Sequence, residues 1–321
     1  MTELSSNVDS KLSTSIIQQL QSKRICTVIQ FISKDNEKLV TCTGLPLKDI
    51  LEIKRNIMQK YGGIMKSASD LFKIEQNNII PTNLLSLDDI LKGGLYPGQI
   101  YEICGASSSG KTQLCLTIAN NVALESKNIV RYIDTKRDFS GSRIEQILFK
   151  KNYNKQVIDE VMNRIKVCCI YKLDQLFKIL RLLTVSLKEE KAEYRTRIII
   201  IDSLPAIIFK FSQSHETTVA LNHIANMCHF IANEFQLSIV TVNLVTQWNT
   251  NAEGSTNTNR SENYNEVTPA LGKYWSHVPN TRLLMEKIGI ESRKISVWKS
   301  FQLAPNVACT LSINDCGISC S

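Results

Sequence analysis

The chain has 321 residues, 43% of them hydrophobic, and a formal net charge of +8 at pH 7. This length can fill one large hydrophobic core with a small accessory domain beside it. The apolar runs are far shorter than the roughly 20 residues of a membrane-crossing helix, and the N-terminus resembles no signal peptide, so we expect no membrane contact and reduced thiols. The ten cysteines include no CxxC pair and the four histidines no HExxH cluster, which argues against a zinc site.

Positive charge is concentrated towards the N-terminus. Residues 11–66 carry ten basic and four acidic side chains, which supply +6 of the total charge. A basic module attached to a nearly neutral remainder is typical of a domain that binds a polyanion. A solvated helix surface would explain the same charge, so both interpretations stay open at this point.

Residues 1–63 are predicted to form a small all-helical domain, because apolar residues recur there at helical intervals without a period-two alternation. The clearest helix follows the turn Thr43-Gly44-Leu45, has Pro46 in its first turn and stops at Gly62-Gly63.

This turn and helix are our candidate DNA contact. Backbone N–H groups near Gly44 and the cations Lys48, Lys54 and Arg55 could meet nucleic-acid phosphates, as they do in helix-hairpin-helix modules. The same residues would also begin an ordinary helix.

Residues 64–85 lack strong periodicity and are predicted to be a linker, followed by an α/β core over residues 86–321. Strand and helix patterns then alternate. We predict strands at 99–104, 129–134, 165–171, 197–202, 238–243, 281–287, 295–298 and 307–313, and helices after 110, from a capping box at 142–145, around 176–183 and over 217–235. This order predicts a mostly parallel central sheet covered by helices.

The strongest motif lies between the first predicted strand and helix of this core. Gly105-Ala106-Ser107-Ser108-Ser109-Gly110-Lys111-Thr112 matches the phosphate-binding loop at every fixed position, with Gln113 after it. In such a loop the backbone N–H groups face phosphate oxygens, the lysine reaches the β and γ phosphates, and the Thr112 hydroxyl ligates Mg²⁺. We therefore predict that the chain binds ATP or a close relative, together with Mg²⁺.

Asp202 ends a run of four isoleucines that is typical of a buried parallel strand. Downstream of a complete phosphate-binding loop, this aspartate is expected to hold the Mg²⁺ ion through a water molecule. Taken alone, an aspartate at a strand end would only mark the end of that strand.

Several segments together carry a family resemblance. They are the run 93–99 before the first strand, Gly110-Lys111-Thr112-Gln113, Tyr132-Ile133-Asp134-Thr135, and the run 269–279 with Thr281-Arg282-Leu283. Over nearly the whole chain these segments resemble the RecA/RadA recombinase superfamily, and within it the D-type paralogues of the eukaryotic strand-exchange recombinase. The resemblance implies a RecA-like core, a nuclear role in homologous-recombination DNA repair, single-stranded DNA binding, and assembly with other paralogues that assist the main recombinase.

Two positions depart from the working recombinases. Those enzymes have a water-activating glutamate where this chain has Lys136, and a glutamine that senses the γ-phosphate where it has Leu244. An ammonium group cannot accept a proton at neutral pH, so ATP hydrolysis is expected to be weak, and no catalytic residue is assigned. Glu145 could conceivably substitute, although its spacing argues against it. A structural adaptor that keeps ATP as a fold ligand and a genuine DNA-dependent ATPase remain the alternatives.

The family's core contacts DNA in the region that corresponds to the loop 246–268. Here that loop carries Glu253, Arg260, Glu262 and Glu266, and its net negative charge suits phosphates poorly, although Trp248 and Tyr264 could still stack on bases. We therefore assign the DNA contact to the basic N-terminal domain.

The recombinases also dock subunits through a Phe-x-x-Ala segment. Its nearest counterpart in this chain is Met65-Lys66-Ser67-Ala68, followed by Leu71 and Phe72. An apolar linker that covers its own core domain is an equally good interpretation.

Overall fold

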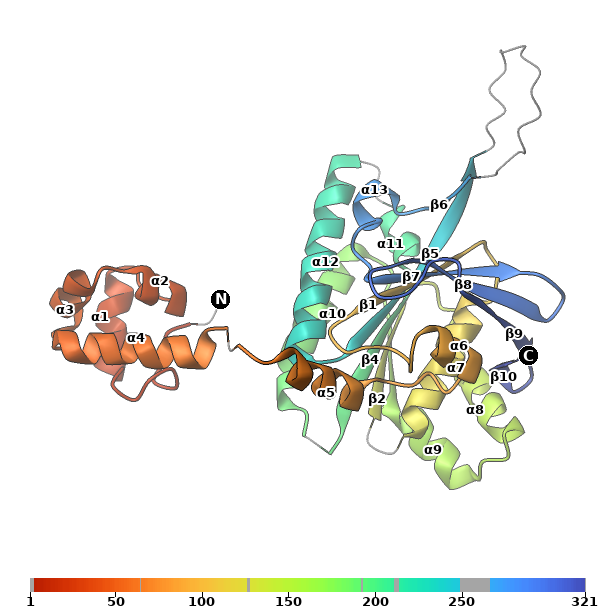
Figure 1. Cartoon of the computed structure of the whole chain (residues 1–321), viewed down its shortest axis with the longest axis horizontal. Helices are drawn as coiled ribbons and strands as arrows, with labels where there is room; N and C mark the ends of the chain where they lie inside the picture. Colours follow the sequence, from red (N-terminus) through yellow and green to blue (C-terminus); the bar gives the residue numbers. More distant parts are fainter. Residues whose placement is uncertain are drawn as a thin grey trace, which may run out of the picture. The chain divides into compact units, whose positions relative to one another are not determined.

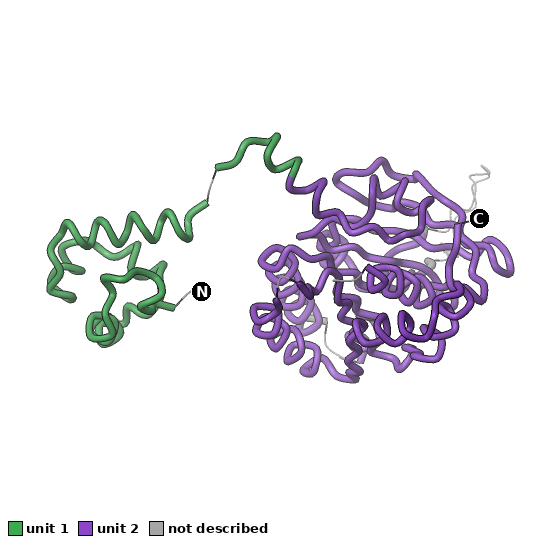
Figure 2. Tube along the Cα trace, turned by 90° about the horizontal axis from the view of Figure 1, so that it is seen from below, with its two compact units in different colours: residues 1–73 green, residues 74–321 purple. Residues whose placement is uncertain are grey.

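The structure is a computed structural model that describes residues 3–63, 65–125, 128–191, 193–210, 214–248 and 266–320. The chain divides into two compact units, residues 1–73 and residues 74–321 (Figures 1 and 2).

The boundary between the units falls inside helix α5 (Ala68–Asn78), within the segment that we predicted to be a linker. The hydroxyl of Ser67 accepts a hydrogen bond from the Asp70 backbone N–H at 3.1 Å, which caps the start of this helix. None of the α5 side chains is buried, and Leu71 and Phe72 are 45% and 61% exposed.

The N-terminal unit is helical. Its helices are α1 (Thr14–Ser22), α2 (Val28–Ser33), α3 (Asn36–Thr43) and α4 (Leu47–Tyr61). Leu20, Phe31, Ile50 and Ile53 are fully buried in its own small core. Helix α4 begins one residue later than predicted, because Pro46 has extended backbone angles and is the residue before the helix rather than part of its first turn.

The larger unit is built on one sheet with the strand order β10-β9-β8-β7-β1-β5-β4-β2-β3, from which β6 pairs with β5 alone. The strands are β1 (Ile100–Gly105), β2 (Asn128–Asp134), β3 (Ile165–Cys169), β4 (Arg195–Asp202), β5 (Ser238–Trp248), β6 (Glu266–Pro269), β7 (Thr281–Lys287), β8 (Ser292–Ser300), β9 (Ala308–Asn314) and β10 (Gly317–Cys320). The pairs from β7 through β1, β5, β4 and β2 to β3 are parallel, and β7 to β10 form an antiparallel extension. The predicted mostly parallel sheet is confirmed.

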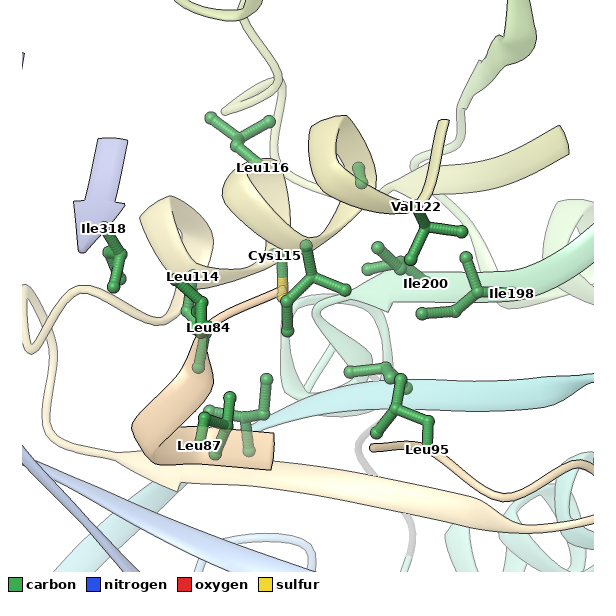
Figure 3. Close-up of a cluster of buried hydrophobic side chains, with 14 of the residues drawn as sticks. Leu84, Leu87, Leu95, Leu114, Cys115, Leu116, Val122, Ile198, Ile200 and Ile318 are labelled. Atoms are coloured by element: carbon green, nitrogen blue, oxygen red, sulfur yellow. The ribbon is translucent and has the colours of Figure 1, made fainter. Parts of the chain in front are cut away.

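Helices cover both faces of the sheet (Figure 1). One face packs against α6 (Leu85–Ile90), α7 (Lys111–Leu124), α8 (Gly141–Lys150) and α9 (Lys155–Arg164), and the other against α10 (Leu173–Ser186), the 3₁₀ helix η1 (Leu187–Glu189), α11 (Leu204–Ile208), α12 (Ser214–Phe235) and α13 (Gly272–Trp275). Side chains alternate along β4, so Ile198 and Ile200 meet the first layer, where Figure 3 shows them beside Val122 of α7. Ile199 and Ile201 meet the second layer.

Several local predictions were wrong or incomplete. Helix α8 is capped by Ser140, whose hydroxyl accepts from the Arg143 N–H at 3.1 Å, so the predicted capping box at 142–145 does not form. Five helices (α5, α6, α9, α11 and α13) and two strands (β6 and β10) were not predicted. The ends of the loop at 246–268 are strands, because β5 continues to Trp248 and pairs with β6. Glu253, Arg260, Glu262 and Tyr264 of that loop lie outside the described residues, whereas Glu266 begins β6.

Within the described part of the chain, no helix combines the length and apolar character needed to cross a membrane. In the same residues, no three His, Cys, Asp or Glu side chains come together as a metal-binding group.

Candidate nucleotide-binding site

The phosphate-binding loop connects the carboxyl end of β1 to the first turn of α7. Gly110 has a φ of 107°, in the left-handed region, and a Cβ atom there would lie 2.5 Å from the Ile313 side chain. A glycine is therefore needed at this position. Strand β5 lies between β1 and β4 in a parallel arrangement, which brings Asp202, at the end of β4, to the same edge of the sheet as the loop.

Lys111 is folded back onto the loop itself. Its ammonium group donates to the carbonyl oxygens of Gly105 at 2.9 Å and Ala106 at 2.6 Å, and its side chain is largely buried. Burial, followed by the positive charge of Lys136, lowers the pKa of Lys111. Its partners, including the Ser109 hydroxyl at 3.4 Å, are all neutral. A buried cation with neutral partners favours an anionic ligand, and phosphate oxygens would replace these partners.

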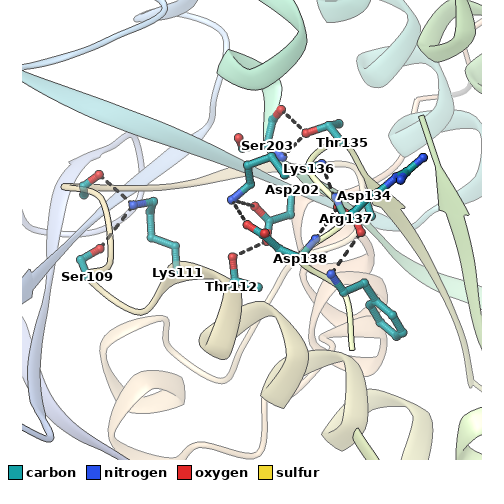
Figure 4. A network of polar contacts seen from close by, with 12 residues as sticks. Ser109, Lys111, Thr112, Asp134, Thr135, Lys136, Arg137, Asp138, Asp202 and Ser203 are labelled. Atoms are coloured by element: carbon teal, nitrogen blue, oxygen red, sulfur yellow. Dashed lines mark hydrogen bonds and ion pairs between the residues drawn. The ribbon is translucent and has the colours of Figure 1, made fainter. Parts of the chain in front are cut away.

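Thr112 and Asp202 meet directly. The Thr112 hydroxyl donates to Oδ2 of Asp202 at 2.7 Å, and the Tyr132 hydroxyl donates to the same oxygen at 2.9 Å. Asp202 is 1% exposed, and its other oxygen, Oδ1, accepts no hydrogen bond among the described groups (Figure 4). A hydroxyl oxygen and a carboxylate oxygen that accepts no hydrogen bond are hard donors that fit Mg²⁺, which usually binds one or two carboxylates together with phosphates and water.

A cavity of about 720 Å³ opens beside these groups, which is within the usual size range of ligand sites. Its lining shares six residues with the predicted site: Ser107, Ser108, Gly110, Lys111, Thr112 and Gln113. Gly105, Ala106 and Ser109 lie behind them, in contact with the Lys111 ammonium. The structure thus gathers the predicted loop residues around one cavity.

The loop after β2 is held by Asp134. Its carboxylate accepts the backbone N–H groups of Lys136, Arg137, Asp138 and Phe139 at 2.9–3.3 Å. This anchoring fixes the residue that occupies the position of the recombinases' catalytic glutamate.

The side chain at that position points towards Asp202. The Lys136 ammonium lies 2.6 Å from Oδ2 of Asp138 and 3.6 Å from Oδ1 of Asp202 (Figure 4). Burial lowers the pKa of Lys136, but the hydrogen bond with Asp138 and the charge of Asp202 outweigh it and raise the pKa above the usual lysine value. Lys136 is therefore a cation at neutral pH and cannot act as a base.

Glu145 does not replace the missing glutamate. Its carboxylate accepts from Lys155 at 3.1 Å, is half-exposed, and is absent from the cavity lining. Leu244 does line the cavity, so an apolar side chain stands where the recombinases have their glutamine. Beside it, the Asn243 amide donates to the buried carboxylate of Glu102 at 2.9 Å.

Sequence reasoning missed several residues of this site. Arg293 on β8 donates to the Ser109 carbonyl at 2.8 Å and lines the cavity, and Phe209 and Lys210 line it after α11. No local motif marks these positions, because strand order alone brings them to the loop. Tyr132 belongs to a motif that we had recognised, but its hydrogen bond to Asp202 was not foreseen.

The candidate DNA residues lie at the start and along one side of α4. Gly44 ends α3 with a φ of 68°, and its N–H donates to the Val40 carbonyl at 2.8 Å. Lys48 and Arg55 are exposed and, seven residues apart, lie on the same side of the helix. The Lys54 ammonium instead donates to the Lys34 carbonyl at 2.6 Å, which ties α4 to the end of α2.

Comparison with known sequences places these features in a family. The sequence model of the Rad51 family matches residues 75–321, and that of the RAD51D N-terminal domain matches residues 1–59. The chain is 28% identical over 281 residues to DNA repair protein RAD51 homolog 4 of Bos taurus, which covers 86% of this chain and 82% of the relative. It is 25% identical over 319 residues to DNA repair protein RAD51 homolog 2 of Mus musculus, and the match covers 90% of each chain. It is 27% identical over 308 residues to DNA repair protein RAD51 homolog 1 of Arabidopsis thaliana, and the match covers 88% of this chain and 86% of the relative.

Proposed function

Because this chain belongs to the Rad51 family, we propose that it is a nuclear, ATP-binding recombinase paralogue that acts in DNA repair by homologous recombination. In this role it binds single-stranded DNA and assembles with other paralogues to assist the main recombinase. The observation that carries the proposal is the cavity beside Lys111, where Thr112 and Asp202 meet at 2.7 Å.

The nucleotide is ATP with Mg²⁺. The loop N–H groups and Lys111 hold the phosphates, since a helix N-terminus and a buried ammonium both favour negative charge. Thr112 would hold the Mg²⁺ ion directly, and Asp202 would hold it through water. When bound, this ion neutralises phosphate charge.

ATP hydrolysis by the chain alone is weak. No carboxylate replaces the catalytic glutamate at position 136, and the Lys136 ammonium has no lone pair with which to orient an attacking water molecule. Leu244 cannot relay a hydrogen bond from the γ-phosphate. ATP therefore acts mainly as a ligand that stabilises the folded state.

Single-stranded DNA binds the N-terminal unit. Lys48 and Arg55 present two exposed cations on one side of α4. Lys11, by contrast, is bound to Asp49 at 2.6 Å and to Glu52 at 2.7 Å, which leaves it less available to phosphates. This separation of paired from exposed cations favours a phosphate contact along α4 over a uniformly charged surface.

Assembly with paralogues uses the edge of the sheet at β3. Among the described residues this strand pairs only with β2, so its outer backbone groups can accept another strand. A cavity of about 370 Å³ lies between this edge and α10, and the exposed side chains of Val167, Leu182 and Val185 line it. An apolar side chain of an added strand would fill it.

The test is ATP binding and single-turnover hydrolysis by the full chain, with and without single-stranded DNA. We expect tight binding, negligible turnover, and loss of binding in Lys111→Ala. Lys188→Ala is the matched control, because Lys188 is exposed on η1, outside the cavity lining. DNA-stimulated turnover that Lys111→Ala abolishes would make the chain an active ATPase. Binding of ATP without any DNA affinity would favour the structural adaptor.

A further inference from the structure

Lys136 lies at the point where a metal ion would compensate the charge of Asp202. The carboxylate is 1% exposed, and two hydroxyl groups donate to its Oδ2 atom while Oδ1 accepts no hydrogen bond among the described groups. A buried carboxylate requires a counter-charge. The nearest cation is the Lys136 ammonium, whose 3.6 Å distance from Oδ1 fits an ion pair.

The position of this ammonium is enforced by its surroundings. Asp134 fixes the backbone N–H groups of Lys136 and the three residues that follow, and Asp138 binds the ammonium at 2.6 Å. The Lys136 side chain is nevertheless 35% exposed and lines the nucleotide cavity. Lys136 can therefore face a phosphate group without leaving Asp202.

The cavity as a whole is rich in positive charge. Its described lining contains four cationic side chains, those of Lys111, Lys136, Lys210 and Arg293, and only one carboxylate, that of Asp138. A polyphosphate that enters this cavity meets cations already in place. A divalent cation at Asp202 would instead lie within a few ångströms of a fixed ammonium, and like charges at that range disfavour each other.

We propose that Lys136 is a resident counter-charge of the nucleotide site, which takes over much of the metal's electrostatic role, so that the chain retains ATP with only a weak dependence on Mg²⁺. This inference rests on the proposed ATP binding at the same cavity. Lys136 then has a role of its own, which is to position the phosphates by its charge, in addition to replacing the catalytic base.

The test measures the dissociation constant of a fluorescent ATP analogue for the full chain, in Mg²⁺ and in excess EDTA. For the unaltered chain we expect the two constants to agree within about threefold. Lys136→Met removes the charge but keeps a side chain of similar length. It should raise the ratio of the dissociation constant in EDTA to that in Mg²⁺ to about tenfold or more. Lys136→Arg should keep the ratio low, and Lys188→Met controls for the loss of one positive charge elsewhere.

A second readout does not use nucleotide. Loss of the ammonium leaves Asp202 without its counter-charge, so Mg²⁺ alone should raise the melting temperature of Lys136→Met more than that of the unaltered chain.

The outcomes separate the two proposals. An unaltered chain that loses tenfold or more of its affinity in EDTA overturns the role of Lys136 and leaves ATP binding intact. This measurement needs no variant, so it tests the proposed role of Lys136 even if Lys136→Met fails to fold. Equal ratios for Lys136→Met and the unaltered chain also overturn it. Absence of binding in both buffers overturns the inference together with the proposed ATP site.

Discussion

The ion pair between Glu102 and Arg282 is buried in the centre of the sheet, and replacing one partner should destabilise the larger unit strongly. The Arg282 guanidinium, 4% exposed, donates to Glu102, which is fully buried on β1. The other Glu102 oxygen accepts from the Trp275 indole at 2.7 Å and from the Asn243 amide at 2.9 Å. The carboxylate thus joins β1, β5, β7 and α13 at one point.

Arg282→Met should cost about 3–5 kcal/mol, because it leaves a buried carboxylate with only neutral donors. Arg282 also donates to the carbonyls of Trp275 and Ser276, which lose those partners. In a unit of this size each kcal/mol lowers the melting temperature by about 2–4 °C, so we expect a fall of about 6–20 °C. Urea unfolding, followed by circular dichroism, measures the free energy directly.

A double-mutant cycle with Glu102→Gln tests the reasoning. Each single variant leaves one charge buried and alone, whereas Glu102→Gln/Arg282→Met leaves none. The double variant should therefore be more stable than the sum of the single effects predicts, by about 2 kcal/mol or more. Additivity within about 0.5 kcal/mol would refute a strong coupling between the two side chains.

Three further outcomes follow from the structure. Asp134→Ala removes the acceptor of four backbone N–H groups, so the free energy of unfolding measured in urea should fall by about 2–3 kcal/mol. ATP binding should also weaken. Asp134→Asn should retain part of the stability and part of the affinity for ATP. Lys48→Glu/Arg55→Glu should weaken single-stranded DNA binding and flatten its dependence on salt by about 1.4 units of slope, about 0.7 for each lost phosphate contact. An equal loss in Lys23→Glu would contradict a specific α4 contact. Burial lowers the pKa of His229 below 6.5, so the unfolded chain binds a proton first and the free energy of unfolding should fall as the pH drops below 6.5, an effect that His229→Gln should remove.

The sequence could predict those parts of the fold in which the residue pattern of a segment directly reflects the position of that segment in the folded chain. The isoleucines of β4 are apolar on both sides because both faces of this strand are covered, and this placed Asp202 at the strand end before the structure did. The phosphate-binding loop was equally visible, because Gly110 is required by the loop's own backbone angle.

The parts that could not be predicted depend on contacts between distant segments. Arg293 reaches Ser109 only because β8 and the antiparallel extension pack beside the loop, and no pattern near either residue reveals that contact. The cap of α8 shows a subtler limit. Ser140 and Ser142 are both good caps in sequence, and the path of the chain after Asp134 selects the first.

The lysine at position 136 adds a positive charge to the nucleotide site as well as removing the catalytic glutamate. A glutamate there would place a second carboxylate near Asp202, and that carboxylate could accept a proton from an attacking water molecule. Lysine reverses the sign of the charge, so the same position would attract phosphate, would reduce the need for a metal ion and cannot act as a base. On the proposed function, this one residue would both weaken hydrolysis and favour retention of the nucleotide.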